Sequence, residues 1–397
     1  MAADDKSLHN LATHAAPATR PNVQRLEQAT LADVEAMRLL LRGGSVIDWH
    51  RLALTDAAEV DRFLALNEFD PANADDMDRL EELRADAVEY LTRNFSYRIP
   101  EDVAHGMPAR DLLLLASSRG KKQTYACIVL KVMHVMHHLA GRELLFKLPV
   151  SDDEVFGFVE AKVVKVVEEI RAAGYPIVEF AWSRKERDSV VTKLLAKKAT
   201  IAADVFDKLR FRLITRSLDD LPAVLHEMVH RLIPFNYVIP GQTVNAILPF
   251  RRFLELEPAY ARFSDQLQLD LDTEENENPG INEFSGPTYK VINFVADLPV
   301  RIDQFLCRVP GAENELGSVI FVLTEFQVMD AETARLNEAG ENSHAKYKAR
   351  QHDRVKFRLS QGEKGLRDQT LPSFTLEDLQ KSAAAEIGDD DDDIEEP

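Results

Sequence analysis

The sequence predicts an α+β fold, in which a mixed β-sheet flanked by helices follows an all-helical N-terminal region. Between about residues 30 and 142, apolar side chains recur every three or four positions and no strand-like alternation is present. After Pro149, short apolar runs typical of strands alternate with helical patterns. The 397 residues are 45% apolar with 16 Gly and 18 Pro, a globular composition that can bury a large core without disulfides or a structural metal.

The N-terminal region shows helical patterns of three kinds. Leu31, Val34 and Met37 recur on one face of an expected helix. Residues 76–91 carry many charges around a narrow apolar stripe, which is typical of an amphipathic surface helix. Residues 124–139 are apolar almost all round, so this helix is expected to be buried between others.

The second region alternates strands and helices. The expected strands are residues 176–182, 211–215, 290–295 and 319–327. The expected helices are residues 152–173, 189–198, 221–232 and 331–338. We therefore divide the chain into a disordered arm (1–27), a helical domain of unknown role (28–150), an α+β domain (151–358) and a flexible acidic tail (359–397).

Charge and cysteine content exclude several classes of protein. The net charge is −19, and the eight acids between Glu386 and Pro397 leave the rest of the chain at about −11. A chain this acidic, without a long basic stripe, is not expected to bind nucleic acid in bulk. Cys127 and Cys307 cannot build a disulfide framework, and no apolar run is long enough to span a membrane, so we expect a cytoplasmic protein.

Histidines suggest two candidate metal sites. His226-Glu227-Met228-Val229-His230 matches the H-E-x-x-H pattern of zinc peptidases, in which two histidines ligate zinc and the glutamate is the general base. The apolar stripe of its helix places both histidines at a flank or toward solvent, so we expect them to point away from any cleft and to lack a third ligand. His134, His137 and His138 are expected to be core or boundary histidines, because no carboxylate or cysteine lies at matching spacing.

A second constellation indicates a triphosphate site with a magnesium ion. Lys185, Ser189 and Lys193 recur every four residues where a strand runs into a helix, which is a favourable place for binding phosphates. Asp207 precedes the strand that carries Arg210 and Arg212, and Glu325 lies near the end of a later strand. Two carboxylates from adjacent strands are what Mg²⁺ needs when it also takes phosphate oxygens. His344, Tyr347 and Lys348 add donors after the last expected helix.

In order and spacing, these motifs resemble the synthetase domain of the RelA/SpoT alarmone synthetases, a nucleotidyltransferase-like fold, between about residues 175 and 350. The family's Lys, Ser and Lys at four-residue spacing correspond to residues 185–193. Its Asp and Arg five residues apart correspond to Asp207 and Arg212. Its E-x-Q corresponds to Glu325 and Gln327, and its H-x-x-Y-K to residues 344–348.

The sequence also departs from the family's pattern. The family's Arg before the first Lys falls on Ser183, with Arg184 beside it, and its Arg-Thr after E-x-Q falls on Met329-Asp330. The acceptor loop is matched loosely by Tyr289, with Asn293 in the place of the family's His. Donor-side and metal residues are therefore retained better than acceptor-side residues, and no hydrolase signature H-D-x-x-E-D is present.

The resemblance implies a Mg²⁺-dependent enzyme that transfers pyrophosphate from ATP to a ribose hydroxyl of an acceptor nucleotide. Glu325 would assist deprotonation of the acceptor and share Mg²⁺ with Asp207, and Tyr289 would stack on the acceptor base. The ATP phosphates would be held by residues of the first two strands and the helix between them: Arg184, Lys185, Ser189, Lys193 and Arg212. The acceptor could be GDP, GTP, an adenine nucleotide or the 3′ end of a tRNA. A zinc peptidase or an inactive nucleotide-binding relative are the alternatives.

Overall fold

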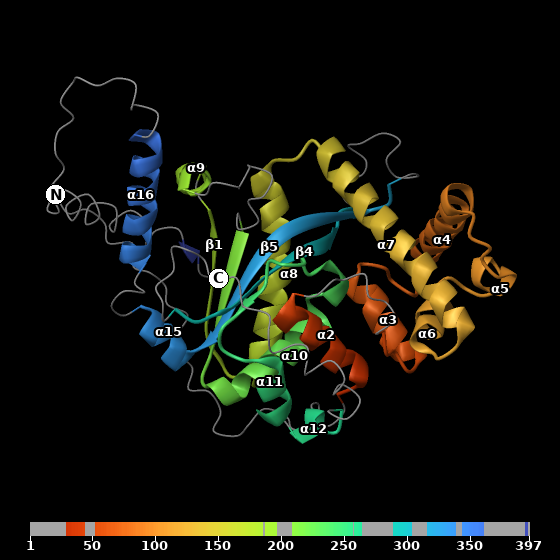
Figure 1. Cartoon of the computed structure of the whole chain (residues 1–397), viewed down its shortest axis with the longest axis horizontal. Helices are drawn as coiled ribbons and strands as arrows, with labels where there is room; N and C mark the ends of the chain where they lie inside the picture. Colours follow the sequence, from red (N-terminus) through yellow and green to blue (C-terminus); the bar gives the residue numbers. More distant parts are fainter. Residues whose placement is uncertain are drawn as a thin grey trace, which may run out of the picture.

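The computed structural model describes residues 29–43, 52–185, 187–196, 209–256, 258–263, 289–303, 316–338, 344–360 and 394–395. The predicted arm (1–27), most of the acidic tail and Asp207 lie outside these residues. Within them the predicted class is confirmed: the chain is α+β, with a helical N-terminal region followed by a mixed sheet flanked by helices (Figure 1). No helix among the described residues combines the length and apolar character needed to cross a membrane.

Three helices of the N-terminal region and four strands correspond to predicted segments. The first helices are α2 (Leu31–Arg42), α3 (Ala57–Leu66), α4 (Ala74–Phe95), α5 (Glu101–Ala104), α6 (Asp111–Ser117) and α7 (Lys121–Lys147). The strands are β1 (Ile177–Arg184), β2 (Leu209–Thr215), β3 (Val244–Asn245), β4 (Ile292–Arg301), β5 (Val319–Asp330) and β6 (Ile394–Glu395). Of these elements, α3, α5, α6, β3 and β6 were not predicted, and β4 extends six residues beyond the expected strand, to 301 rather than 295. They form one sheet in the order β3-β4-β5-β2-β1-β6, in which β2 and β5 are parallel and the other pairs are antiparallel.

The remaining helices surround this sheet. They are α8 (Asp152–Ala172), α9 (Arg187–Ala196), α10 (Leu221–Arg231), α11 (Phe250–Leu256), α12 (Pro258–Ala261), α15 (Ala331–Asn337) and α16 (His344–Ser360). Two short 3₁₀ turns, Leu218–Asp220 and Phe235–Tyr237, flank α10. In Figure 1, α9 and α16 lie at one end of the molecule and α4, α5 and α6 at the other. The last helix, α16, was not among the predicted helices.

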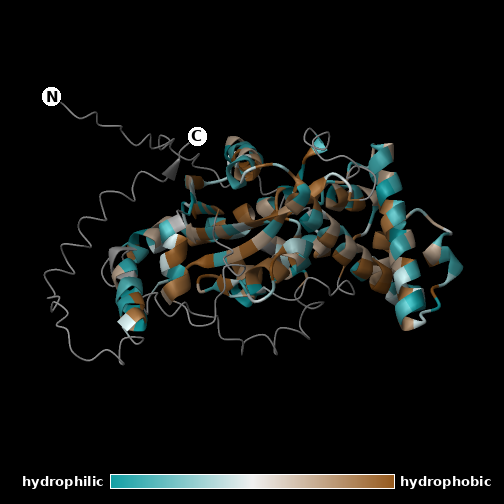
Figure 2. Cartoon of the chain, turned by 90° about the horizontal axis from the view of Figure 1, so that it is seen from above, coloured by the Kyte–Doolittle hydropathy of each residue, from teal (hydrophilic) through white to brown (hydrophobic). Residues whose placement is uncertain are grey.

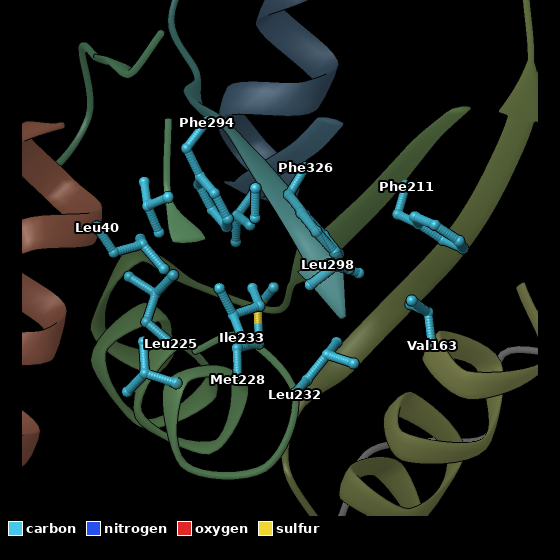
Figure 3. Packing of buried hydrophobic residues seen from close by; sticks show 14 of the residues in the cluster. Leu40, Val163, Phe211, Leu225, Met228, Leu232, Ile233, Phe294, Leu298 and Phe326 are labelled. Carbon is cyan, nitrogen blue, oxygen red and sulfur yellow. The ribbon is translucent and has the colours of Figure 1, made fainter. Parts of the chain in front are cut away.

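The main core lies between one face of the sheet and helices α2, α8 and α10. Leu225, Met228 and Leu232 from α10 and its C-terminus are fully buried there against Phe326 and its neighbours, as the apolar stripe predicted (Figure 3). In Figure 2 the strands in the middle of the molecule are largely hydrophobic, whereas the helices at its two ends carry hydrophilic surfaces. A second core joins α3, α4, α6 and α7.

Helix α2 belongs to the core of the sheet although it precedes the rest of the helical region. Val34, Met37, Leu40 and Leu41 are buried in the same cluster as α10 and the strands. Thr30 caps the helix in a capping box with Asp33, which fixes where it begins. The N-terminal region is therefore attached to the sheet through α2 as well as through α7, which packs against β5.

Candidate active site

Strand register gathers the predicted polar residues on one face of the sheet. In the parallel pair, Arg210 of β2 lies opposite Glu325 of β5, and Arg212 lies opposite Gln327. In the antiparallel pair, Asn293 of β4 lies opposite Gln327. Because paired residues in register point to the same side of a sheet, these five side chains share one face. We call them the polar face.

The residues between them explain why the polar set points to this side. Phe211 and Phe326 alternate with the polar residues along β2 and β5, and both are fully buried in the main core. Their rings stack with centroids 5.6 Å apart. A shift of either strand by one residue would exchange the two faces and place arginine and glutamate in the core. The hydrophobic pattern thus fixes the side on which the site is built.

An ion pair lies at the centre of the polar face. Arg210 Nε donates to Glu325 Oε2 at 2.7 Å, and the glutamate side chain is only 9% exposed whereas the arginine side chain is 35% exposed. A carboxylate that is largely buried and held on one side by an arginine has a defined orientation. Glu325 is therefore positioned to accept a proton or to ligate a cation on its remaining side.

Two further members of the polar face hold buried polar atoms without a partner among the described residues. Arg212 donates from Nη2 to Glu338 at 3.1 Å, but its Nε has no acceptor. The side-chain oxygen of Asn293 has no donor. Buried groups of this kind are uncommon in folded proteins and are typical of sites completed by water or a ligand.

Tyr289 lies beside these groups, where the sequence motif placed an acceptor-binding aromatic residue. Burial raises the pKa of its phenol, while the positive charges of Arg210 and Arg212 act in the opposite direction. It packs against a small apolar cluster that contains Ile214 and Met329. The structure therefore brings Tyr289, Arg210, Arg212 and Glu325 into one neighbourhood.

The predicted phosphate-binding segment leaves the sheet next to this ion pair. Ser183 in β1 lies opposite Arg210, so Lys185, two residues later, follows the end of β1 beside the start of β2. Helix α9 begins at Arg187 and carries Ser189 and Lys193, whose side chains are half-buried. The backbone is thus placed as the phosphate hypothesis requires, and the direction of these side chains toward Glu325 stays a prediction.

Arg184 is placed differently from the rest of the predicted phosphate set. It lies opposite Leu209, on the core side of the sheet. Its guanidinium donates to Glu160 from Nε at 2.6 Å and from Nη2 at 2.5 Å, and to Asp153 at 3.2 Å. The hydrogen bonds to Glu160 are the main reason that its pKa is raised. The structure therefore joins Arg184 to α8 rather than to the polar face.

Other predicted site residues are only partly placed. Asp207 lies outside the described residues, so the shared magnesium site of Asp207 and Glu325 stays a prediction. His344, Tyr347 and Lys348 belong to the first turns of α16, which contacts α9. The side chains of His344 and Tyr347 are not among those described, and Lys348 is half-buried. The contact joins α16 to the helix that carries Ser189 and Lys193, and the roles of His344, Tyr347 and Lys348 stay predictions.

The departure at Met329-Asp330 has a structural role. Asp330 is the N-cap of α15, where its Oδ1 accepts from the backbone N–H of Glu332 and Thr333 at 3.1 Å. Met329 packs in the cluster beside Tyr289. These two residues therefore secure α15 against the end of β5.

The H-E-x-x-H helix requires a correction. His226 is buried at 3% exposed and does not face solvent, because α10 packs against α2 on its other side. Asp33 of α2 lies 3.7 Å from His226 Nε2 and 3.5 Å from His230 Nδ1. The prediction that no third ligand converges on the two histidines is thus wrong. Sequence analysis missed Asp33 because its position in a capping box indicates only where a helix begins. The local sequence does not show which distant residues Asp33 contacts.

The glutamate of that motif does not support a peptidase. Glu227 is 1% exposed and its Oε1 accepts a hydrogen bond from the hydroxyl of Tyr175 at 2.7 Å. The same oxygen is 3.7 Å from His226 Nδ1, the ring nitrogen that faces away from Asp33. A general base must reach the water that it activates, and Glu227 lies on the far side of the imidazole.

The three histidines of α7 are core or boundary residues, as predicted: His137 is buried, and His134 and His138 are partly buried. His138 Nε2 lies 2.7 Å from Asp297 Oδ2 of β4, at hydrogen-bonding distance. Burial lowers the pKa of His134 to about 4 and that of His137 to about 3. The group of Asp33, His226 and His230 is the one potential metal-ligand cluster found among the residues that the structure describes.

Comparisons with known proteins find the alarmone synthetases at the level of structure only. No family model and no curated protein matches the sequence. Among solved structures, small alarmone synthetase 2 from Bacillus subtilis is 13% identical, with a TM-score of 0.26, and the match covers 63% of this chain and 93% of that chain. Small alarmone synthetase 1 from the same organism, bound to its product pppGpp, is 13% identical, with a TM-score of 0.25 and coverages of 58% and 92%.

A GTP pyrophosphokinase family protein from Streptococcus pneumoniae is 14% identical, with a TM-score of 0.26 and coverages of 58% and 92%. These structures come from the family that the sequence motifs resemble. TM-scores this low describe a loose superposition, so the roles of individual residues rest on the geometry of this chain.

Proposed function

We propose that this protein transfers a pyrophosphoryl group from ATP to a ribose hydroxyl of an acceptor nucleotide, with Mg²⁺ as cofactor. The observation that carries the proposal is the register of β2, β4 and β5. It assembles Glu325, Gln327, Arg210, Arg212 and Asn293 on one face of the sheet. Glu325, Gln327 and Arg212 belong to the motifs that resemble the family, and strand register brings Arg210 and Asn293 to the same face.

Glu325 is the proposed catalytic base. The acceptor hydroxyl oxygen attacks the β-phosphorus of ATP, the bond between that phosphorus and the α–β bridging oxygen breaks, and AMP leaves. The proton of the hydroxyl passes to the Glu325 carboxylate. Arg210 holds one oxygen of this carboxylate at 2.7 Å, which keeps the group oriented before the substrate arrives.

The described residues supply one of the two carboxylates of the proposed magnesium site. Glu325 supplies a hard carboxylate oxygen, and Asp207 is the proposed second ligand. Mg²⁺ would neutralise charge on the phosphates during transfer. Lys185, Ser189 and Lys193 are proposed to hold the ATP phosphates together with the first N–H groups of α9.

Tyr289 and Asn293 are the proposed acceptor-binding residues. Tyr289 is an aromatic surface beside the base, and the side-chain oxygen of Asn293 lacks a partner among the described residues. Stacking on a nucleobase and a hydrogen bond to its edge would use both features. Gln327, His344, Tyr347 and Lys348 are proposed to support the phosphates from β5 and α16.

The proposal is tested by incubating the full chain and Mg²⁺ with ATP labelled in the β-phosphate. GDP, GTP, an adenine nucleotide and deacylated tRNA are offered in turn, and products are separated by thin-layer chromatography. Label that moves onto one acceptor, with AMP released in equal amount, is the expected result. Glu325→Gln should abolish it, whereas Glu332→Gln, which changes an exposed glutamate on α15, should not. The proposal fails if no acceptor becomes labelled.

Nucleotide binding without transfer is a second candidate function. The observation that favours it is the engagement of Arg184 by Glu160 and Asp153, which removes one cation from the predicted phosphate set. Tight binding of ATP, measured by calorimetry, with no AMP formed under any acceptor would favour this function over transfer.

A further inference from the structure

A buried cluster of one carboxylate and two imidazoles lies away from the polar face. Asp33 of α2 and His226 and His230 of α10 offer three ligand atoms that all lie within 4.8 Å of one another. Helix α10 packs on the core side of the sheet, opposite the polar face. The proposed pyrophosphoryl transfer uses none of these residues.

The cluster contains polar atoms that the protein itself leaves unsatisfied. Both ring nitrogens of His226 and Nδ1 of His230 are buried and lack a hydrogen-bond partner among the described residues. The two rings are one helical turn apart on α10 and lie nearly parallel, with centroids 5.2 Å apart. His226 Nε2 and His230 Nδ1 converge on the Asp33 carboxylate at 3.7 and 3.5 Å without forming a hydrogen bond, an arrangement that a bound cation would complete.

The spacing of the donors suits a small tetrahedral cation. Ligand atoms in a tetrahedral zinc site with bonds of about 2.05 Å lie roughly 3.3 Å apart, whereas neighbouring donors of an octahedral site lie roughly 3.0 Å apart. His230 Nδ1 lies 3.5 Å from Asp33 Oδ1, and His226 Nε2 lies 3.7 Å from Asp33 Oδ2. Both distances are within a few tenths of an ångström of the tetrahedral value, and the three ligand atoms all lie within 4.8 Å of one another.

The surroundings orient the ligands from outside. Asp33 Oδ2 accepts from the backbone N–H of Thr30 at 2.9 Å, and Asp33 Oδ1 accepts from Arg62 at 2.9 Å. On the other side, Glu227 lies 3.7 Å from Nδ1 of His226 and is itself held by Tyr175. A carboxylate behind a metal-bound imidazole fixes its tautomer and its orientation, so Glu227 is a positioning residue.

The cluster also has an entry path. The side chain of His230 is 32% exposed, whereas those of Asp33 and His226 are 6% and 4% exposed. A cation can therefore enter past His230, and a water molecule on that side can complete four-coordination.

We propose that Asp33, His226 and His230 form a mononuclear zinc site that ties α2 to α10. The site is structural: it connects the start of the helical region to the helix beneath the sheet. The H-E-x-x-H motif supplies two ligands and one positioning carboxylate, and the third ligand comes from a residue 193 positions before His226.

The experiment measures metal in the full chain, expressed without a histidine tag and dialysed against metal-free buffer. Elemental analysis should find about one zinc per chain in the wild type. His230→Gln, which changes the half-exposed ligand, should reduce zinc to below about a tenth of that value. The matched control is His105→Gln, which removes an exposed histidine and should leave the zinc content unchanged.

Cobalt substitution gives a second readout that does not depend on purification history. The metal-depleted wild type should develop the visible absorption of four-coordinate Co²⁺, and His230→Gln should not. Circular dichroism verifies that the variant remains folded. Glu227→Gln should keep the site but lower its zinc affinity by about 10–100-fold.

Four results would overturn the proposal. A wild type without zinc and without a cobalt spectrum would leave only an ion pair between Asp33 and His226. Equal zinc loss in His105→Gln and His230→Gln would mean adventitious binding. Stoichiometric Fe²⁺ in place of zinc would replace the metal assignment. Peptide cleavage by the zinc-loaded chain that Glu227→Gln abolishes, with zinc retained, would replace the structural role with a peptidase.

Discussion

The two halves of one sheet face have opposite characters, although the same strands build both. Along β5, Val319 and Phe321 lie in the first half and Glu325 and Gln327 in the second, all on the same side. In the first half Phe321 is fully buried among aromatic rings, with the centroid of Tyr237 at 4.6 Å and that of His138 at 4.7 Å. In the second half the side chains are charged or amidic.

The difference comes from α7, which covers the first half. At Gly141 the helix approaches so closely that a Cβ would lie 2.5 Å from the ring of Phe321 and 2.7 Å from the carbonyl oxygen of Val319. Among the residues that the structure describes, no helix approaches the second half so closely, and α15 and Tyr289 border the polar face there. A sheet face thus becomes core or candidate site according to the element that covers it. Four predictions test this comparison.

The largest effect is expected at Glu325. Glu325→Gln should reduce pyrophosphoryl transfer by about 10²–10⁴-fold, because it removes the proposed base while keeping the shape of the side chain. Initial rates of AMP release measure the loss. The unfolding midpoint should change little, since Arg210 is partly exposed and can be solvated. A variant with wild-type rates would show that the polar face is not the catalytic site.

In the half of the sheet face that α7 covers, we expect a substitution to change the stability of the protein through packing. Gly141→Ala on α7 should destabilise the protein relative to Gly157→Ala on α8, where a Cβ meets only Arg184 at 4.0 Å. Both changes bring the same gain in helix propensity, so their difference reports overpacking, about 1–3 kcal/mol. Urea unfolding of both variants gives the comparison. Equal stabilities would mean that α7 does not lie so close to β5.

Acid should weaken the covered half first. Burial, together with the positive charge of Arg79 and the neighbouring His134 and His138, lowers the pKa of His137 to about 3. An unfolded histidine titrates near 6.5, so between these values the unfolded state binds more protons. Stability should therefore fall as the pH drops from about 6.5 toward 3, by up to about 1.4 kcal/mol per pH unit for this group.

The test of this sign is His137→Leu, measured by urea unfolding at pH 7, 6 and 5. In the variant, the free energy of unfolding should depend less steeply on pH, because leucine does not titrate. Both nitrogens of His137 lack hydrogen-bond partners among the described residues. His105→Gln, at an exposed position, is the control. An unchanged slope in His137→Leu would assign the acid sensitivity to other groups.

The smallest effect is expected at the end of β5, where α15 begins. Asp330→Ala removes the N-cap of α15 and should cost about 1 kcal/mol, within the range of 0.5–2 for such caps. Asp330→Asn keeps an oxygen acceptor and should remain near wild type. Thermal unfolding of the pair distinguishes them. Loss of stability in both would assign Asp330 a role that depends on its charge.

Most of the fold could be predicted because helices and strands are encoded by local patterns. The strand expected at 319–327 is β5 (Val319–Asp330), and the helix expected at 221–232 is α10 (Leu221–Arg231). Helix α16 was missed because its sequence is dominated by charged residues with few apolar positions, so no clear stripe predicts it. Its contact with α9 is a tertiary interaction that the local sequence does not reveal.

The sequence by itself determined which residues are candidates for chemistry: the spacing of the residues identifies the lysines and serine before and in α9, the E-x-Q of β5 and the histidine pair of α10. Only the tertiary structure decided which of them meet. Strand register places Arg210 next to Glu325, which is 115 positions away in the sequence. It places Arg184 on the core side of the sheet, opposite the polar face. Helix packing brings Asp33 to His226 and His230. The physical reason is that side-chain periodicity is a local property, whereas strand pairing and helix docking depend on the burial of distant apolar faces.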